Sequence, residues 1–170
     1  YELGELKRVI NSLLQNIDSF SKQNILIAAT NHPELLDKAI WRRFNTVIEI
    51  GLPQEEEIVT LIKTFTSDFS TEFNTDDKRL DRLSKQFAGK SPSDIKTIIN
   101  NAKAQTVIND RDTLHYEDVL IELFEFNHRG NLTIEKVVEY LYENGVPQNT
   151  IAERMNVSIR QIRNYLNKQS

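Results

Sequence analysis

A short apolar run that ends on a polar residue constrains this chain most. Residues 25–29 are apolar at every position, and Asn31 follows one residue later. A run of this length without alternation is typical of a strand buried on both faces of a parallel sheet. Residues 46–50 are β-rich and end at Gly51, so we expect a second strand there. The beginning of the chain therefore predicts a partial α/β core.

Helical periodicity dominates the rest of the chain, so the predicted fold class is mostly α. Amphipathic patterns predict a helix over residues 5–17 and another that starts near Pro33. Beyond the second strand, the pattern predicts four helices that together form a small helical unit, over residues 54–67, 75–87, 91–110 and 115–126.

The composition excludes several kinds of protein. Among 170 residues there is no cysteine, so no disulfide or thiolate metal site is expected, and the three histidines lack ligand spacing. No apolar run approaches the roughly 20 residues that cross a bilayer, and the first residues do not resemble a signal peptide. The net charge of −4 argues against nucleic-acid coating by the whole chain. We therefore expect a cytoplasmic protein without a metal site.

Asn31 is the first candidate for chemistry. Ligands of open parallel sheets bind beyond the carboxyl ends of the strands, where a residue that follows a buried strand would lie. An amide that both donates and accepts could orient a water or a phosphate oxygen there. The alternative is that Asn31 caps the helix that starts at Pro33. The residues alone do not decide between these two interpretations.

Arg42 and Arg43 lie between a predicted helix end and the second strand. The helix dipole and solvent both favour arginine at such a position, so a salt-bridging role for at least one is expected. An exposed arginine could instead act in trans and stabilise the transition state at the γ-phosphate of a neighbouring subunit. Two arginines alone leave both roles open.

The order and spacing of these residues resemble one family. One run comprises Ala28-Ala29-Thr30-Asn31, Leu36-Asp37-Lys38-Ala39-Ile40, Arg42-Arg43-Phe44 and Leu52-Pro53. It resembles the AAA branch of the AAA+ ATPases, and within that branch it is most similar to the meiotic clade, which includes katanin and spastin. The resemblance implies that Asn31 is the sensor 1 residue. It also implies that Arg42 and Arg43 are arginine fingers that reach the nucleotide of an adjacent protomer.

A second stretch is similar to the sensor 2 region of this family. It runs from Gly89 through Lys90-Ser91-Pro92-Ser93 to Asp94 and Ile95. The resemblance implies that Gly89 and Ser91 lie near the adenine and ribose, and that Asp94 caps or braces the helical lid. From the residues alone, Gly89 is equally well a turn and Ser91 a helix start.

The resemblance covers roughly residues 1–124, and two motifs of the family are missing. The chain has no Gly-x-x-x-x-Gly-Lys-Ser/Thr phosphate loop and no apolar strand that ends in Asp-Glu. We therefore expect this chain to be the C-terminal part of a subunit and to be inactive alone. In the strand order of the family, the strand of the phosphate loop lies between the two predicted strands, so they would lack their shared neighbour. For the intact protein the resemblance implies ATP and Mg²⁺ as cofactors and a homo-oligomer, as a hexameric ring.

The end of the chain has the spacing of a helix-turn-helix. Helices are predicted over residues 132–144, 148–155 and 159–166, with Gly145 as a helix stop and Asn156 in a left-handed turn. The pattern resembles bacterial helix-turn-helix domains of the type Ile-Ala-x-x-Met-x-Val-Ser-x-x-x-Ile-x-x-Tyr-Leu.

If this unit binds DNA, the start of the last helix would face the major groove. Base edges or phosphates would then meet Ser158, Arg160, Gln161 and Asn164, and the DNA backbone would meet Arg163 and Lys168. The alternative is a small three-helix bundle that docks against protein.

These observations predict four segments: residues 1–53 as the end of the AAA+ α/β subdomain, 54–126 as a four-helix lid, 127–131 as a linker and 132–170 as the helix-turn-helix. The first functional hypothesis is the C-terminal part of a bacterial or phage AAA ATPase that remodels a protein or nucleic-acid partner. The second is a DNA-binding regulator in which the AAA-like part serves as a scaffold or assembly module.

Overall fold

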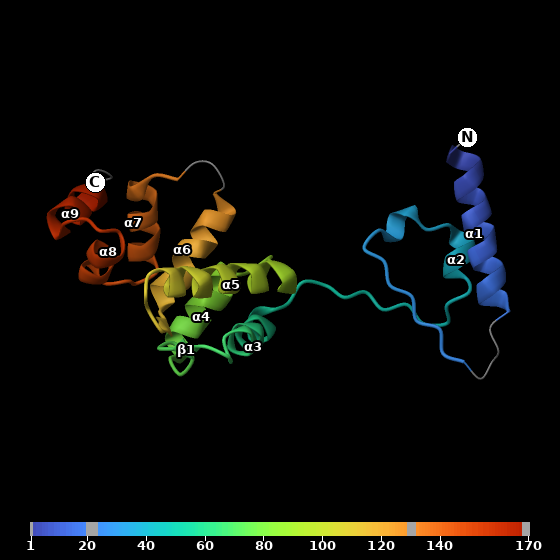
Figure 1. Ribbon diagram of the computed structural model, residues 1–170, viewed down its shortest axis with the longest axis horizontal. Coiled ribbons are helices and arrows are strands. Elements are labelled where there is room, and N and C mark those ends of the chain that lie inside the picture. Colours follow the sequence, from blue (N-terminus) through green and yellow to red (C-terminus); the bar gives the residue numbers. More distant parts are fainter. Residues whose placement is uncertain (1, 20–23, 129–131, 168–170) are drawn as a thin grey trace. The chain divides into compact units, whose positions relative to one another are not determined.

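The computed structural model describes residues 2–19, 24–128 and 132–167, and the side chains of residues 2–7 and 11 lie outside this description. Two compact units make up the chain, residues 1–50 and residues 51–170, and each is described by itself (Figure 1). Most described residues are helical, and the fold also contains one small parallel sheet. The expected predominance of helix is confirmed.

The first unit contains α1 (Glu2–Asp18), the 3-10 helix η1 (Pro33–Leu35) and the short α2 (Lys38–Trp41). The single helix predicted to start at Pro33 is thus divided in two. Leu36 has extended backbone angles between the pieces, and Asp37 starts α2 because its Oδ1 accepts a hydrogen bond from Ala39 N at 2.7 Å.

The two predicted strands are wrong for the described structure. Residues 25–29 and 46–50 are not assigned as strands, and their large apolar side chains face solvent, with Ile25 89% and Ile48 79% exposed. A strand needs neighbouring backbone to complete its ladder of hydrogen bonds, and neither segment pairs with another described one. The apolar pattern therefore predicted burial that this chain does not supply by itself.

The second unit contains seven helices among the described residues. Their bounds agree closely with the predicted ones, and they are α3 (Glu55–Phe65), α4 (Asp77–Gln86), α5 (Pro92–Ile108), α6 (Tyr116–Asn127), α7 (Ile134–Glu143), α8 (Gln148–Arg154) and α9 (Ile159–Asn167). None of the described helices combines the length and apolar character that a membrane span requires.

The small sheet lies in this second unit, and the sequence analysis did not predict it. It pairs β1 (Ser70–Thr71) with β2 (Thr113–Leu114) in parallel, in the register Ser70 to Thr113 and Thr71 to Leu114. Strands of two residues are too short to produce a periodic signal. The pairing holds the connection between α3 and α4 beside the connection between α5 and α6.

Local signals determine where these helices begin and end. Ser91 and Asp94 form a reciprocal capping box at the start of α5, which confirms the predicted bracing role of Asp94. Gly145 and Asn156 have φ values of 80° and 51°, as predicted for the stop after α7 and the turn between α8 and α9. The end of the chain thus contains two short helices, α8 and α9, with Asn156 in the turn between them.

One hydrophobic core extends through the whole second unit. Side chains from α3 to α6, among them Ile62, Leu83, Ile98 and Leu123, belong to the same buried cluster as those of α7–α9. The predicted packing positions of the last two helices lie in or against it: Ile151, Ala152 and Ile162 are buried, and Val157 and Leu166 are partly buried.

Candidate functional site

Asn31 lies in a bend that follows the extended residues 25–29, and its side chain is exposed. It does not cap a helix, because His32 precedes η1 and the side chain of Asp37 caps α2. Among the described residues no hydrogen bond engages its amide. The capping interpretation is therefore wrong for Asn31, and its side chain is available to contact a bound group.

Arg43 is held in place by a carboxylate. Its Nε and Nη2 donate to Oδ1 and Oδ2 of Asp18 at 2.7 and 2.8 Å, and its Nη1 donates to Ala39 O at 2.7 Å. The hydrogen bond from Arg43 lowers the pKa of Asp18, and the same bond raises the pKa of Arg43. The expected salt-bridging role is confirmed for this arginine. Asp18 was not predicted, because no sequence pattern signals a pair that is 25 positions apart.

Arg42 differs from its neighbour. It follows the last residue of α2, its side chain is exposed, and it forms no ion pair with a residue that the structure describes. Two consecutive arginines thus have different surroundings: one is fixed inside the unit and the other extends into solvent. No hydrogen bond in the described part of the unit joins either of them to Asn31.

Gly89 and Ser91 lie in the second unit, in the loop between α4 and α5. Gly89 is exposed with φ +79°, and a Cβ added there would meet nothing within 4 Å. The Ser91 hydroxyl donates to Asp94 Oδ2 at 2.7 Å and accepts from Asp94 N at 3.1 Å, so the cap already uses it. A ligand at this loop would therefore find open space beside Gly89 and backbone groups, whereas the Ser91 hydroxyl is already used in the cap.

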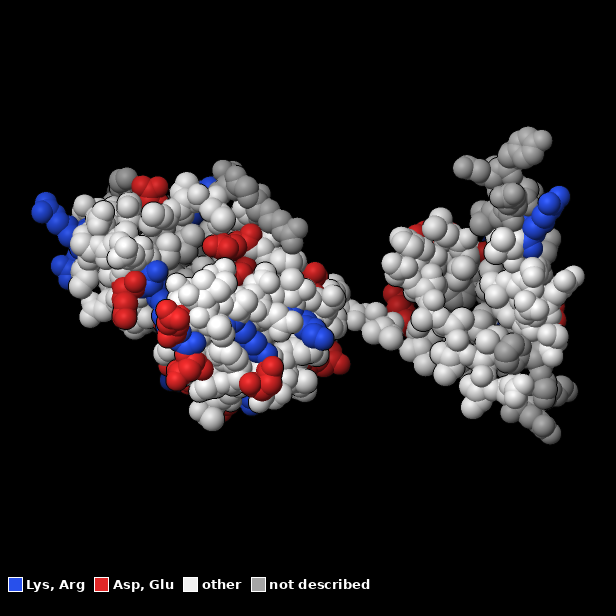
Figure 2. All heavy atoms as spheres, viewed as in Figure 1, with Lys and Arg blue, Asp and Glu red and all other residues white. Residues whose placement is uncertain are grey.

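The outward surface of α9 carries positive charge and no acidic residue. Arg160, Arg163 and Asn164 are exposed, and neither arginine pairs with a described carboxylate. Figure 2 shows positively charged side chains, in blue, at the end of the unit formed by α9.

Two other residues that were predicted to contact DNA, Ser158 and Gln161, bind each other in the cap of α9. Ser158 N donates to Gln161 Oε1 at 2.9 Å, and Gln161 N donates to Ser158 Oγ at 3.2 Å. Both side chains are nevertheless exposed. Lys168, the last predicted contact, lies outside the described residues.

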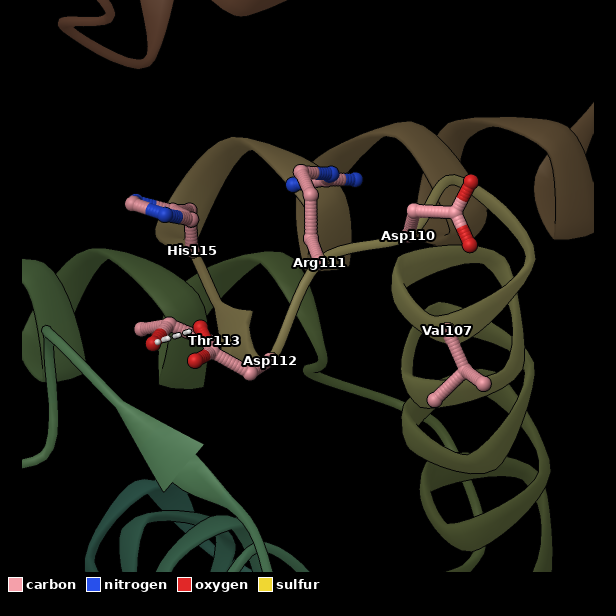
Figure 3. A pocket seen from close by; sticks show the side chains of 6 residues that line it. All are labelled: Val107, Asp110, Arg111, Asp112, Thr113 and His115. Atoms are coloured by element: carbon pink, nitrogen blue, oxygen red, sulfur yellow. Dashed lines mark hydrogen bonds between the residues drawn. The ribbon is translucent and has the colours of Figure 1, made fainter.

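A hollow of about 640 Å³ that the sequence did not predict lies beside the loop between α5 and α6. Figure 3 shows Arg111 and His115 extending from this loop, while Val107 belongs to α5. The guanidinium of Arg111 is bound by both carboxylate oxygens of Asp118, at 2.7 and 3.0 Å. The hollow is open to solvent and contains none of the predicted site residues, so we assign no chemistry to it.

A neighbouring groove brings together the side chains of Glu72, His115 and Glu117, whose ligand atoms lie within 4.8 Å of one another. Each carboxylate already has a cationic partner, Arg79 for Glu72 and Arg154 for Glu117. A metal ion would have to displace these arginines. The arrangement therefore stabilises the fold through ion pairs, and we assign no metal role to it.

Comparison with known proteins gives a match to one family. Residues 2–52 match the family model described as ATPase family associated with various cellular activities (AAA). This stretch contains Asn31, Arg42 and Arg43, together with the previously unrecognised Asp18.

Individual relatives extend the similarity over most of the chain. A proteasome-activating nucleotidase of Methanothermobacter thermautotrophicus is 32% identical over 146 residues, which is 84% of this chain and 34% of that protein. An ATP-dependent zinc metalloprotease FtsH of Hahella chejuensis is 31% identical over 118 residues, 67% of this chain and 19% of that protein. The chain thus spans about a third or less of the length of these relatives.

Proposed function

The chain is a relative of the AAA ATPases, and from this premise we propose that it forms the part of an ATPase subunit that completes the ATP site of a neighbouring subunit. The observation that carries the proposal is the contrast between the two arginines. Arg43 is fixed by Asp18, whereas Arg42 extends into solvent without an ion pair to a described residue.

The arginine pair supplies positive charge in trans. In phosphoryl transfer, charge spreads over the oxygens of the γ-phosphate, and a guanidinium from a second subunit stabilises it. Arg42 has the exposure that such a reach requires. Arg43 serves as the second finger and also holds the turn through Asp18, which limits the conformations that Arg42 can adopt.

Asn31 orients the attacking water. Its amide can accept a hydrogen bond from water and donate one to a phosphate oxygen, and no described residue occupies it. Because residues 25–29 before it are exposed and pair with no described segment, its final position depends on the backbone that pairs with them in the intact subunit.

The residues present fit only the periphery of an ATP–Mg²⁺ site. Gly89 offers open space for the adenine or ribose beside the Ser91 cap. The phosphate loop and the Asp-Glu strand are absent from the sequence, so this chain alone is expected not to hydrolyse ATP. In the intact protein, hydrolysis of ATP would supply the energy for remodelling a protein or nucleic-acid partner, and Mg²⁺ would neutralise charge on the phosphates.

The remaining predictions belong to the same proposal. The segments are residues 1–53 for the α/β part, 54–126 for the lid, 127–131 for the linker and 132–170 for the helix-turn-helix.

Four further predictions are kept: the likeness to the meiotic clade, a hexameric ring, a bacterial origin and a cytoplasmic location. Two relatives are named as a proteasome-activating nucleotidase and a zinc metalloprotease, and those names describe those proteins alone.

Mixed oligomers test whether the arginines act in trans. In the intact protein, Arg42→Ala should lower the ATP turnover number by roughly 10³-fold or more. Mixing these subunits with subunits that lack their own phosphate-loop lysine should restore part of the turnover, because each supplies what the other lacks. Lys38→Ala removes an exposed cation from α2 and should leave turnover near that of the parent. Unchanged turnover in Arg42→Ala and in Arg43→Ala would refute the proposal.

A second candidate function is DNA binding by the helix-turn-helix, with the AAA-like part as scaffold or assembly module. The left-handed turn at Asn156 and the uncompensated charges of Arg160 and Arg163 favour it. Gel-shift titrations of the parent chain and of Arg160→Ala/Arg163→Ala test it, since each lost phosphate contact should reduce the salt dependence by about one ion.

A further inference from the structure

The three C-terminal helices do not form an appendage that is independent of the lid. Val138, Leu141 and Val146 are buried in the same cluster as Leu120 and Phe124 of α6. The Phe124 ring also stacks on His128 and lies 5.0 Å from the ring of Tyr140 on α7. Apolar packing therefore continues from the lid into α7.

Polar groups fix this contact at the end of α7. The carbonyl oxygen of Asn144 accepts hydrogen bonds from Tyr116 Oη and from Arg82 Nη1, both at 3.0 Å. Tyr116 belongs to α6 and Arg82 to α4, so two helices of the lid bind the same carbonyl oxygen at the end of α7. Tyr140 Oη adds a third bond, to Gln86 Oε1 of α4 at 3.0 Å.

An ion pair fixes α8 in the same way. Arg154 donates through Nε to Glu117 Oε1 at 3.1 Å, its Nη2 lies 3.0 Å from the same oxygen, and its Nε lies 3.4 Å from Asp118 Oδ1. Both carboxylates are buried at the start of α6, and Arg154 is only 16% exposed. Removing either partner alone would leave a buried charge unpaired, so this ion pair fixes the position of α8 relative to the start of α6.

We define the joint as the contacts of Arg82, Tyr116, Asn144, Tyr140 and Arg154 across the boundary between α3–α6 and α7–α9. Within the unit, α9 lies at the opposite end from α3 (Figure 1). Its Arg160, Arg163 and Asn164 are exposed, none of them belongs to the joint, and no described carboxylate binds the two arginines. The joint and the outer surface of α9 are thus separate features of one body.

Duplex DNA is the partner that this outer surface fits. A helix of nine residues is about 14 Å long, and a B-DNA major groove about 12 Å wide admits a helix. Arginine pairs with guanine and phosphate, asparagine pairs with adenine, and α9 carries no acidic residue that would repel the phosphates.

We propose that α9 binds duplex DNA and that the joint transmits this binding to the lid, so that DNA stabilises α3–α6 as well as α7–α9. The proposal rests on the DNA-binding candidate above and goes beyond it, because the lid also carries the Gly89–Ser91 loop assigned to the nucleotide. A ligand that binds only the folded form stabilises every element that unfolds together with its site. The lid therefore responds to DNA although it does not touch it.

Hydrogen exchange on this chain, with and without a short duplex DNA at low salt, tests the proposal. At a free duplex concentration ten times the dissociation constant, the slowest amides of α4 and α6 should exchange about tenfold more slowly. The same slowing should occur in α8 and α9. ATP hydrolysis plays no part in the measurement, so failure of the ATPase proposal would not affect the result.

Two joint variants and one control variant isolate the joint. Glu117→Gln/Arg154→Met removes the ion pair without leaving one charge unpaired, and Tyr140→Phe is a milder second variant. Both should keep DNA affinity and the slowing in α9, but the ion-pair variant should lose most of the slowing in α4 and α6 and Tyr140→Phe a smaller part of it. Asp68→Asn/Lys103→Met removes an ion pair inside the lid and should behave like the parent.

Three outcomes would overturn the proposal. The parent chain fails to bind the duplex at low salt, the slowing in the parent stops at α7, or both joint variants transmit it to α4 and α6 as fully as the parent does. The first outcome removes the DNA partner, and the other two show that the joint does not transmit binding.

Discussion

The guanidinium of Arg43 binds the carboxylate of Asp18 through two parallel contacts, from Nε to Oδ1 at 2.7 Å and from Nη2 to Oδ2 at 2.8 Å. This fork joins the end of α1 to the end of α2. Paired contacts of this kind fix the orientation of both groups more strictly than a single contact does. Arg42, the residue just before Arg43 in the turn, is therefore presented from a backbone whose position Arg43 determines.

The pKa of Asp18 should report this pair in solution. The hydrogen bond from Arg43 lowers that pKa below its usual value of 3.8. Because the pKa is lowered in the folded chain, the stabilisation by this pair is present at neutral pH and is lost as the pH falls through the lowered value. An NMR titration of the Asp18 carboxyl carbon should show a depressed midpoint. Arg43→Met should raise the midpoint to the usual range and Arg42→Met should not; equal midpoints in the parent and Arg43→Met would contradict the pairing.

Two glycines with the same backbone conformation should respond differently to alanine. Gly145 and Gly89 have φ values of +80° and +79°, but a Cβ at Gly145 would lie 1.8 Å from Arg82 Nη1, whereas one at Gly89 meets nothing within 4 Å. Gly89→Ala should cost about 1–2 kcal/mol of unfolding free energy from backbone strain alone. Gly145→Ala should cost roughly 1 kcal/mol more, because Arg82 must also release the Asn144 carbonyl.

Urea denaturation of both variants measures this difference. Arg82→Ala/Gly145→Ala should cost less than the sum of its single changes, since the clash disappears with the guanidinium. Equal losses in Gly145→Ala and Gly89→Ala would show that Arg82 does not lie against the turn.

Two tyrosines on α7 offer a matched comparison at the joint. Tyr140 is partly buried and donates to Gln86 Oε1 at 3.0 Å, whereas Tyr142 is 49% exposed. Burial raises the pKa of Tyr140, so its hydroxyl stays protonated and donates throughout the ordinary pH range. Tyr140→Phe should lower the unfolding free energy by about 0.5–1.5 kcal/mol, and Tyr142→Phe should have almost no effect. A loss as large in Tyr142→Phe would argue against a specific bond at Tyr140.

The helices could be predicted from the sequence because their signals are local. Capping residues such as Ser91 and turn residues such as Gly145 and Asn156 act on their immediate neighbours, and each lies where its pattern placed it. The two-residue strands β1 and β2 escaped prediction because their pairing joins positions more than forty residues apart, Ser70 with Thr113. The contacts of α4 with the end of α7, from Arg82 to Asn144 and from Tyr140 to Gln86, join equally distant positions.

The two strand predictions were wrong because a strand needs a second backbone to pair with, and the position of Asn31 depends on the same pairing. Ile25 and Ile48 have strand-like neighbours in sequence, but a strand exists only when a second backbone satisfies its hydrogen bonds. The position of Asn31 depends on the same missing ladder. The arginine pair was predictable as a feature of the turn, whereas its division into a fixed and an exposed member required Asp18, which only the structure reveals.

The ion pair between Arg154 and Glu117 provides the strictest test of how α8 is held. The two side chains are 16% and 7% exposed, so removing one of them leaves the other charged and poorly solvated. Arg154→Met alone and Glu117→Gln alone should each lower the unfolding free energy, Arg154→Met by about 3 kcal/mol. The double variant should recover most of that loss, because no unpaired charge remains. Asp118 keeps Arg111 as a partner in all three variants, whereas Arg154 in Glu117→Gln keeps Asp118 at 3.4 Å, so that variant should lose less than Arg154→Met. Urea unfolding of the four proteins completes a double-mutant cycle, and additive losses would mean that the two groups do not interact in the folded chain.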